Sequence, residues 1–207
     1  MPNNDLSISA KIYLLSGKIS HLTQGFCFTK APTGEMVNTQ RLAEGMILAT
    51  LLELVKDGKL EMKDESKKVL FMVAPIIMLK RLNSDGAGLA KAILDKLSEE
   101  KKLTDVIVEI VGAVYLVPQE KILSLVEKEL TGLFEVVEVK KMLGVTRREK
   151  VWDEKKVADL VKRYEGEAQK AFQETIDTPL RMMSLSSIHI AWGQTTEKKK
   201  DDLHDHD

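Results

Sequence analysis

The sequence predicts one mainly helical domain with short β-hairpins. The strongest observation is residues 41–62, which are typical of a helix, a tight turn and a strand in one unbroken run. Leucine, methionine and valine side chains recur there at spacings of three and four residues, as on the buried face of a helix. Residues 121–136 repeat this order, with Gly132 in the place of Gly58. Two such helix-turn-strand units predict winged-helix-like packing.

The remaining elements follow from periodicity, capping residues and helix breakers. A first helix is expected near 6–15, followed by a weakly patterned stretch to residue 38. Thr104 and Asp153 are in positions typical of helix N-caps, and Pro179 is expected to start a late helix. The expected helices after the first unit are 87–97, 104–114, 121–130 and 153–176, with a strand pair over 133–152.

The domain is expected to span 1–193. Residues 194–207 are dense in charge and poor in apolar side chains, which predicts a disordered tail. The most apolar segment, 69–79, contains Pro75, which favours a buried strand, a turn and a second apolar piece over a helix. The alternative for this segment is an exposed contact surface.

The composition limits the possible partners. The 207 residues are 43% apolar and 30% charged, which is ordinary for a globular domain. Lysine and arginine number 31 against 32 aspartates and glutamates, so any attraction to nucleic acid or anionic lipid has to be local. Cys27 is the single cysteine, which excludes an internal disulfide and fits a reducing, cytoplasmic setting.

Neither a targeting segment nor a membrane span is expected. The N-terminus lacks the basic start and long apolar core of a signal peptide. No apolar run reaches the roughly 20 residues that a spanning helix needs.

No residue pattern supports catalysis. None of the four histidines stands in a motif, and the chain has no Walker loop, dinucleotide glycine fingerprint or paired Cys-x-x-Cys. His189 is interpreted as a packed or partly exposed helix residue. The tail histidines His204 and His206 would hold a metal only weakly, because a flexible tail supplies no fixed geometry. We therefore expect no enzyme, no metal site and no cofactor.

The segment 139–151 carries the clearest functional argument. Its expected hairpin tip is apolar and lies between basic residues. Burying an aliphatic side chain is worth roughly 1.5 to 3 kcal/mol, and each cation near an anionic surface about 1 kcal/mol. Together these terms predict reversible membrane binding; the alternative is an ordinary solvated wing. The predicted membrane-insertion residues are Met142, Leu143 and Val145, and the flanking cations are Lys140, Lys141, Arg147, Arg148 and Lys150.

Residues 6 to about 192 resemble the Golgi phosphoprotein 3 family. The segment 51–60 is similar to its Leu-x-Glu-Leu-x-x-x-Gly-Arg-(Ile/Leu) signature, and further matches follow in the family's order. These further matches are 6–15, 88–94, 128–133 and 177–190. Eukaryotic members are peripheral membrane proteins that bind phosphatidylinositol 4-phosphate. The family normally carries further helices, so the resemblance implies a chain shortened at its C-terminus.

The resemblance implies the family's single-domain fold and a hairpin associated with membrane insertion and self-association. Family members hold the lipid headgroup with a tryptophan and arginines, and an ungapped placement puts these positions at Asn38, Ile47, Pro118 and Lys121. Only Lys121 is cationic. Arg41 and the 140–150 cluster are the nearest substitutes, so specific recognition of phosphatidylinositol 4-phosphate is not supported. The predicted headgroup residues are Arg41, Lys121, Lys140, Lys141, Arg147, Arg148 and Lys150.

The sequence thus predicts a non-catalytic peripheral membrane or adaptor protein that binds anionic lipid or phosphoinositide headgroups, at the Golgi if the source is eukaryotic. A winged-helix DNA-binding protein is one alternative, although the acidic residues of the 121–130 helix would repel phosphate. A protein-interaction scaffold that uses 69–79 is the other. The apolar late helix at 177–192 adds a possible homo-oligomer.

Overall fold

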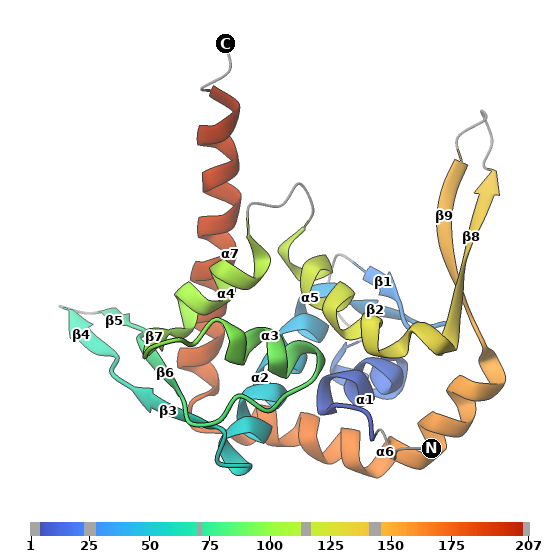
Figure 1. The fold of residues 1–207 in the computed structure, drawn as a ribbon, viewed down its shortest axis with the longest axis horizontal. Helices are drawn as coiled ribbons and strands as arrows, with labels where there is room; N and C mark the ends of the chain where they lie inside the picture. Colours follow the sequence, from blue (N-terminus) through green and yellow to red (C-terminus); the bar gives the residue numbers. More distant parts are fainter. Residues whose placement is uncertain (1–4, 23–27, 70–71, 113–116, 141–145, 205–207) are drawn as a thin grey trace.

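The computed structural model describes residues 5–22, 28–69, 72–112, 117–140 and 146–204. Within these ranges it is mainly helical, with short antiparallel sheets of two or three strands (Figure 1), which confirms the predicted mixture of helices and hairpins. The helices of the described ranges are α1 (Ile8–Leu15), α2 (Thr39–Lys56), α3 (Gly88–Asp95), α4 (Leu103–Val111), α5 (Pro118–Glu127), α6 (Glu154–Asp177) and α7 (Arg181–His204).

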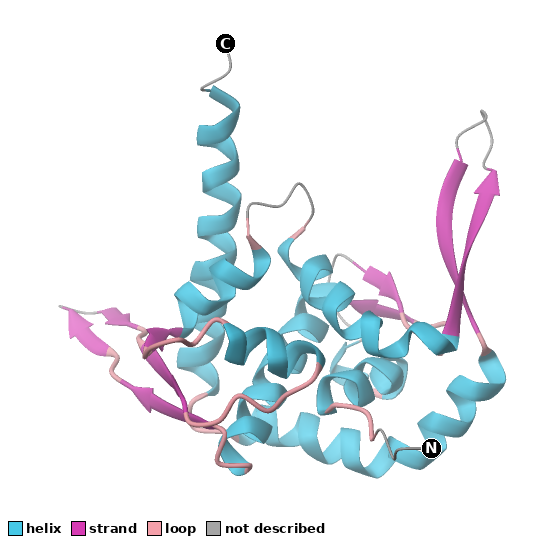
Figure 2. Ribbon diagram, in the orientation of Figure 1, coloured by secondary structure: helices cyan, strands magenta, loops and turns pink. Residues whose placement is uncertain are grey.

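The strands form small antiparallel sheets around the helices. Figure 2 shows the β4–β5 and β8–β9 hairpins at opposite ends of the molecule. The pairs are β1 (Phe28–Lys30) with β2 (Met36–Asn38), β4 (Lys67–Val69) with β5 (Met72–Ala74), and β8 (Phe134–Lys140) with β9 (Thr146–Trp152). A three-stranded sheet has the order β3 (Leu60–Asp64), β6 (Ile77–Arg81), β7 (Lys101–Lys102). The 3-10 helices are η1 (Ser16–Lys18), η2 (Ser20–Leu22) and η3 (Lys128–Leu133).

Helix α2 is the centre of the fold and confirms the first predicted unit. It begins at the N-cap Asn38, whose side chain accepts a hydrogen bond from the Arg41 backbone at 2.8 Å. It ends at Gly58, which has a φ of +65° and allows the Lys59 N–H to donate to the Leu54 carbonyl at 2.9 Å. The chain then enters β3 directly.

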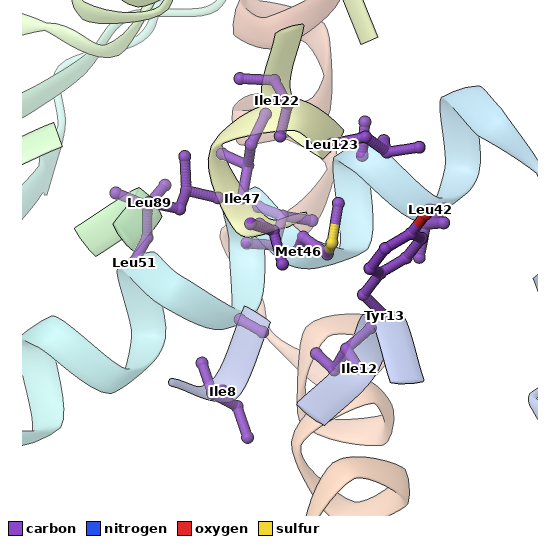
Figure 3. Close-up of a cluster of buried hydrophobic side chains, with 14 of the residues drawn as sticks. Ile8, Ile12, Tyr13, Leu42, Met46, Ile47, Leu51, Leu89, Ile122 and Leu123 are labelled. Atoms are coloured by element: carbon purple, nitrogen blue, oxygen red, sulfur yellow. The ribbon is translucent and has the colours of Figure 1, made fainter. Parts of the chain in front are cut away.

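Side chains from three helices converge on α2 (Figure 3). Each of them is at most 5% exposed, as expected where a helix is enclosed on several sides. The converging residues are Ile8, Ile12 and Tyr13 of α1, Leu42, Met46, Ile47 and Leu51 of α2, Leu89 of α3, and Ile122 and Leu123 of α5.

Two predicted helix boundaries were wrong. Gly132 does not adopt the positive φ of Gly58, because α5 continues into the 3-10 helix η3 and the chain reaches β8 through that tighter turn. Thr104 does not cap α4. Lys102 is the N-cap residue, and the Thr104 hydroxyl instead donates across the α4–α7 contact to the Ser187 carbonyl at 3.4 Å.

The two long C-terminal helices agree with the sequence in part. Asp153 caps α6, as predicted, by accepting a hydrogen bond from the Lys156 backbone at 3.1 Å. Helix α7 differs from the prediction, because it continues through 194–204 where disorder was expected. Lysine and glutamate have good helix propensity, and they extend a helix that packing has already nucleated. None of the helices in the described ranges combines the length and apolar character needed to cross a membrane.

The two predicted contact segments have mixed exposure. In the described part of 69–79, β5 and β6 flank Pro75, and Ile77 and Leu79 are buried. On α7, Met182 and Ile190 are exposed. Self-association through either segment stays a prediction.

Lys11 joins α1 to α6 from an almost fully buried position. Its Nζ lies 2.7 Å from Glu167 Oε1 and 3.1 Å from Asp5 Oδ2, and 4.9 Å from the centre of the Tyr164 ring. Burial alone lowers the pKa of Lys11, but the hydrogen bonds to Glu167 and Asp5 outweigh it and the net shift is upward. The hydrogen bond from Lys11 lowers the pKa of Asp5.

We expect an asymmetry when this cluster is changed. Lys11→Met should alter the free energy of unfolding by less than about 1 kcal/mol, because methionine fills the space without a charge. The double variant Asp5→Asn, Glu167→Gln should lower the free energy of unfolding by about 2 kcal/mol, because the buried Lys11 ammonium is left without a negatively charged partner. Urea unfolding at pH 7 measures both. Equal losses in the two variants would contradict this account.

The same cluster predicts a pH dependence. Because the folded pKa of Asp5 is lowered, its contribution to stability is present above the ordinary value of about 3.9 and is lost as pH falls through the folded pKa. The wild type should therefore lose more stability than Lys11→Met between about pH 5 and pH 2.

Two helical glycines should respond oppositely to alanine. A Cβ on Gly45 would lie 2.5 Å from Cε2 of Phe172, whereas a Cβ on Gly166 meets nothing within 4 Å. We expect Gly45→Ala to destabilise the protein by about 1 kcal/mol, because overpacking outweighs the gain in helix propensity. Gly166→Ala should stabilise it by about 0.5 to 1 kcal/mol. Thermal unfolding of both variants checks the pair, and a stabilising Gly45→Ala would refute the close packing of Phe172.

Candidate functional site

The candidate site is the β8–β9 hairpin, which projects from the helical body (Figure 1). Its register runs from Phe134 opposite Trp152 to Lys140 opposite Thr146, so the predicted strand pair is confirmed over the described residues. Seven extended residues span roughly 20 Å. The C-terminal part of α7 extends from the same side of the body.

Aromatic side chains fix the base of the hairpin. The Trp152 ring lies 4.8 Å from that of Phe134 and meets the ring of Tyr13 edge-on at 6.0 Å, measured between centroids. The Asp153 N–H donates to the Leu133 carbonyl at 2.8 Å and closes the ladder. The inner end of the ribbon is therefore continuous with the core.

A polar contact reinforces this base. The buried Tyr13 hydroxyl donates to Glu127 Oε1 at 2.9 Å, and Lys150 Nζ donates to the other oxygen of the same carboxylate. Burial, together with the nearby Glu127 charge, raises the pKa of Tyr13, so its hydroxyl keeps the proton that it donates. Lys150, predicted as a headgroup residue, therefore holds the hairpin to α5.

The outer end of the hairpin is open to solvent. Lys140 is exposed, and Arg148 is 78% exposed with its Nε 3.5 Å from Glu138 Oε1, a geometry worth little in water. Nearer the base, Val136 and Val151 are also exposed. Val151 is opposite Glu135, the chain neighbour of Val136, so the two valines lie on opposite faces of the ribbon. Each face thus combines charge with uncovered aliphatic surface.

The other predicted residues lie apart from this end or outside the described residues. Arg147 is on β9 opposite Val139. Lys121 is on α5 and partly buried. Arg41 is in the first turn of α2, where its Nη1 donates to the His21 carbonyl at 3.0 Å. The residues that lie outside the described ranges are Lys141, Met142, Leu143 and Val145.

At three of the four positions placed by the family resemblance, the side chain has a structural role. Asn38 caps α2, Ile47 is 0% exposed in the core, and Pro118 is the buried first residue of α5. Only Lys121 of the four offers a cation.

Sequence reasoning missed a cleft at the base of the hairpin. A cavity of about 610 Å³ lies between β9, the start of α6 and the β1–β2 turn. Four lysines line it together with Glu149 and Glu154, and Lys18 is paired with Glu165 at 3.3 Å. These lysines are Lys18, Lys30, Lys150 and Lys162. No local pattern joins positions more than a hundred residues apart, so only the fold brings them together.

The described residues contain no cluster of three or more potential metal ligands from histidine, cysteine, aspartate and glutamate. His189 is half exposed on α7, with its Nε2 2.7 Å from Glu44 Oε1.

In comparisons with known proteins, no protein-family model and no curated protein matches the chain. The resemblance of residues 6–192 to a family stays a prediction.

We expect Glu127 and Glu138 to differ in their effect on the hairpin. Glu127→Gln removes the charge that joins Tyr13 to Lys150 and should accelerate amide hydrogen exchange in β9 at least tenfold, with little change in α2. Glu138→Gln, which removes an exposed pair, should leave both regions unchanged. Equal exchange in the two variants would show that the aromatic contacts alone hold the hairpin.

Proposed function

We propose that this chain is a non-catalytic peripheral membrane protein that contacts anionic lipid through the outer end of the β8–β9 hairpin. The observation that carries the proposal is a ribbon fixed at its base and projecting roughly 20 Å from the body, with Lys140 and Arg148 exposed at its far end. The sequence between the strands, Lys-Met-Leu-Gly-Val, adds apolar side chains where the hairpin would first meet a surface.

The energies favour reversible binding. Three aliphatic side chains contribute at most roughly 1.5 to 3 kcal/mol each, and each cation about 1 kcal/mol near an anionic surface. Ordering costs reduce the sum. A dimer that presents two hairpins would bind more strongly, because the second contact forms at high effective concentration.

Membership of the Golgi phosphoprotein 3 family is part of the same proposal, and the resemblance of residues 6–192 supports it. The likeness does not extend to the headgroup pocket, because the fold uses Asn38, Ile47 and Pro118 for capping and packing. We therefore propose binding that depends on surface charge more than on headgroup identity.

Helix α5 gives a reason to prefer lipid over DNA. In a winged-helix DNA-binding protein, a recognition helix enters the major groove and needs an open, cationic face. Along α5 the one exposed residue is Glu120, while Ile122 and Val126 are completely buried. This helix would present an acid to the phosphates.

We expect salt-sensitive sedimentation with vesicles that contain phosphatidylserine. Leu143→Asp should weaken binding because it places a charge where an apolar tip enters the surface. Reversing the charges of Lys140, Lys141, Arg147 and Arg148 should weaken it further. The comparison is made at about 0.15 M salt, where exposed charges more than about 8 Å apart are screened.

Lys170→Glu on α6, remote from the hairpin, is the control for a single charge reversal and should bind nearly as the wild type does. Equal sedimentation of the wild type and both hairpin variants would exclude this contact surface. Binding of a DNA duplex but not of vesicles would favour the winged-helix alternative.

Headgroup selectivity should be weak. Vesicles of equal charge that carry phosphatidylinositol 4-phosphate or phosphatidylserine should bind within a factor of ten, a difference below about 1.4 kcal/mol. The reason is that three of the four inferred pocket positions cannot hold a phosphate. A preference above tenfold for phosphatidylinositol 4-phosphate would show that a specific pocket exists elsewhere in the chain.

A further inference from the structure

A second cavity, remote from the hairpin in the fold, has a composition suited to an anion with an apolar body. It measures about 380 Å³ and lies where η2, α2, the end of α6 and the start of α7 meet. Its lining is about equally polar and apolar, and the polar residues are Arg41 and Glu44 from α2, Arg181 from α7, Thr175 from α6 and His21 from η2. The apolar lining residues are Leu22, Leu48, Phe172, Ile176 and Leu185.

The charges in this cavity are unbalanced. Among the described residues, neither Arg41 nor Arg181 has a carboxylate within ion-pair distance. Glu44 also lines the cavity, but it already interacts with His189 at 2.7 Å and with Gln40 Nε2 at 2.9 Å. Arg41 uses one N–H on a backbone carbonyl, and its other guanidinium donors remain. Two arginines therefore line a pocket whose one acid has partners of its own.

Two helices approach each other closely at one side of this cavity. Gly45 of α2 lies so near the Phe172 ring of α6 that a Cβ there would sit 2.5 Å from Cε2. The Phe172 ring therefore lies directly beside Gly45 and lines the cavity with it. Thr175, which also lines the cavity, is satisfied internally because its hydroxyl donates to the Phe172 carbonyl at 2.7 Å.

The chemistry narrows the ligand class. Guanidinium groups offer paired donors that match phosphate and carboxylate oxygens. Two of them favour a dianion, and a phosphate monoester carries nearly two negative charges at pH 7. A cavity of this volume also accommodates a small molecule, and apolar walls favour an apolar body.

We propose that this cavity binds a phosphate monoester with a small apolar body, with Arg41 and Arg181 holding the phosphate. Phe172 and the leucines contact the apolar part. The site does not depend on the proposed membrane contact, because it shares no lining residue with the hairpin. The phosphate group is the shared chemistry of a soluble ester and of a lipid headgroup, and the experiment separates these two sources.

The test uses the full chain and calorimetric titration at pH 7.5 with phenyl phosphate, inorganic phosphate, benzoate and phenol. The wild type should bind phenyl phosphate at least tenfold more tightly than the other three. Arg41→Met and Arg181→Met should each weaken phenyl phosphate binding tenfold or more. Arg163→Met, on the exposed side of α6, removes an equal charge outside the cavity and should leave the affinity unchanged.

A second set of measurements identifies the source of the phosphate. Vesicles that carry phosphatidic acid are compared with phosphatidylserine vesicles of equal charge. A loss of phosphatidic acid binding in both cavity variants, beyond that in Arg163→Met, supports a lipid source. Unchanged vesicle binding with lost phenyl phosphate binding supports a soluble one.

Two results would overturn the proposal. One is wild-type affinity for phenyl phosphate in both cavity variants, each with an unchanged circular dichroism spectrum. The other is equal affinity of the wild type for benzoate, phenol and phenyl phosphate. Arg41→Lys and Arg181→Lys serve as second variants if either methionine variant is poorly folded, and they should weaken binding less because charge remains. Loss of vesicle binding in the hairpin variants alone leaves this site untouched.

Discussion

The Glu127 carboxylate is the contact on which the orientation of the candidate site depends. Its two oxygens accept hydrogen bonds from Tyr13 of α1 and Lys150 of β9, so one acid on α5 joins three elements. A two-stranded ribbon is marginally stable by itself in water. The orientation of this ribbon is fixed because its inner end contacts the helical core through Glu127 and through the packing of the Trp152 ring. The outer end stays free of the body, as a surface contact requires.

The parts of the fold that depend on local chemistry could be predicted from the sequence. The periodic leucines of α2, the left-handed turn at Gly58 and the Asp153 cap all involve contacts within one or two helical turns. The sequence predictions that were wrong concern residues whose partners are distant in the chain. The Thr104 hydroxyl donates a hydrogen bond to a carbonyl of α7. The backbone conformation at Gly132 follows from the 3-10 helix that connects α5 to β8.

The same distinction applies to the site. The hairpin itself is a local pattern of alternating strands about a glycine, and it was predicted from residues 139–151. The different roles of its cations were not predicted. Lys150 pairs with an acid on α5, whereas Arg148 lies beside an acid on its own hairpin. The cavity that contains Arg41 and Arg181 was also missed, since one sequence gives no sign that positions 140 residues apart converge.

The two cationic features differ in what they can distinguish. Charges at the hairpin end are exposed and screened within about 8 Å at physiological salt, so in the proposed contact they would respond to the charge density of a surface rather than to one headgroup. Arg41 and Arg181 lie beside apolar walls, where the shape of a ligand and the direction of its hydrogen bonds count for more. As we propose them, the two features are complementary: the hairpin would select a surface by its charge, and the cavity would select a molecule.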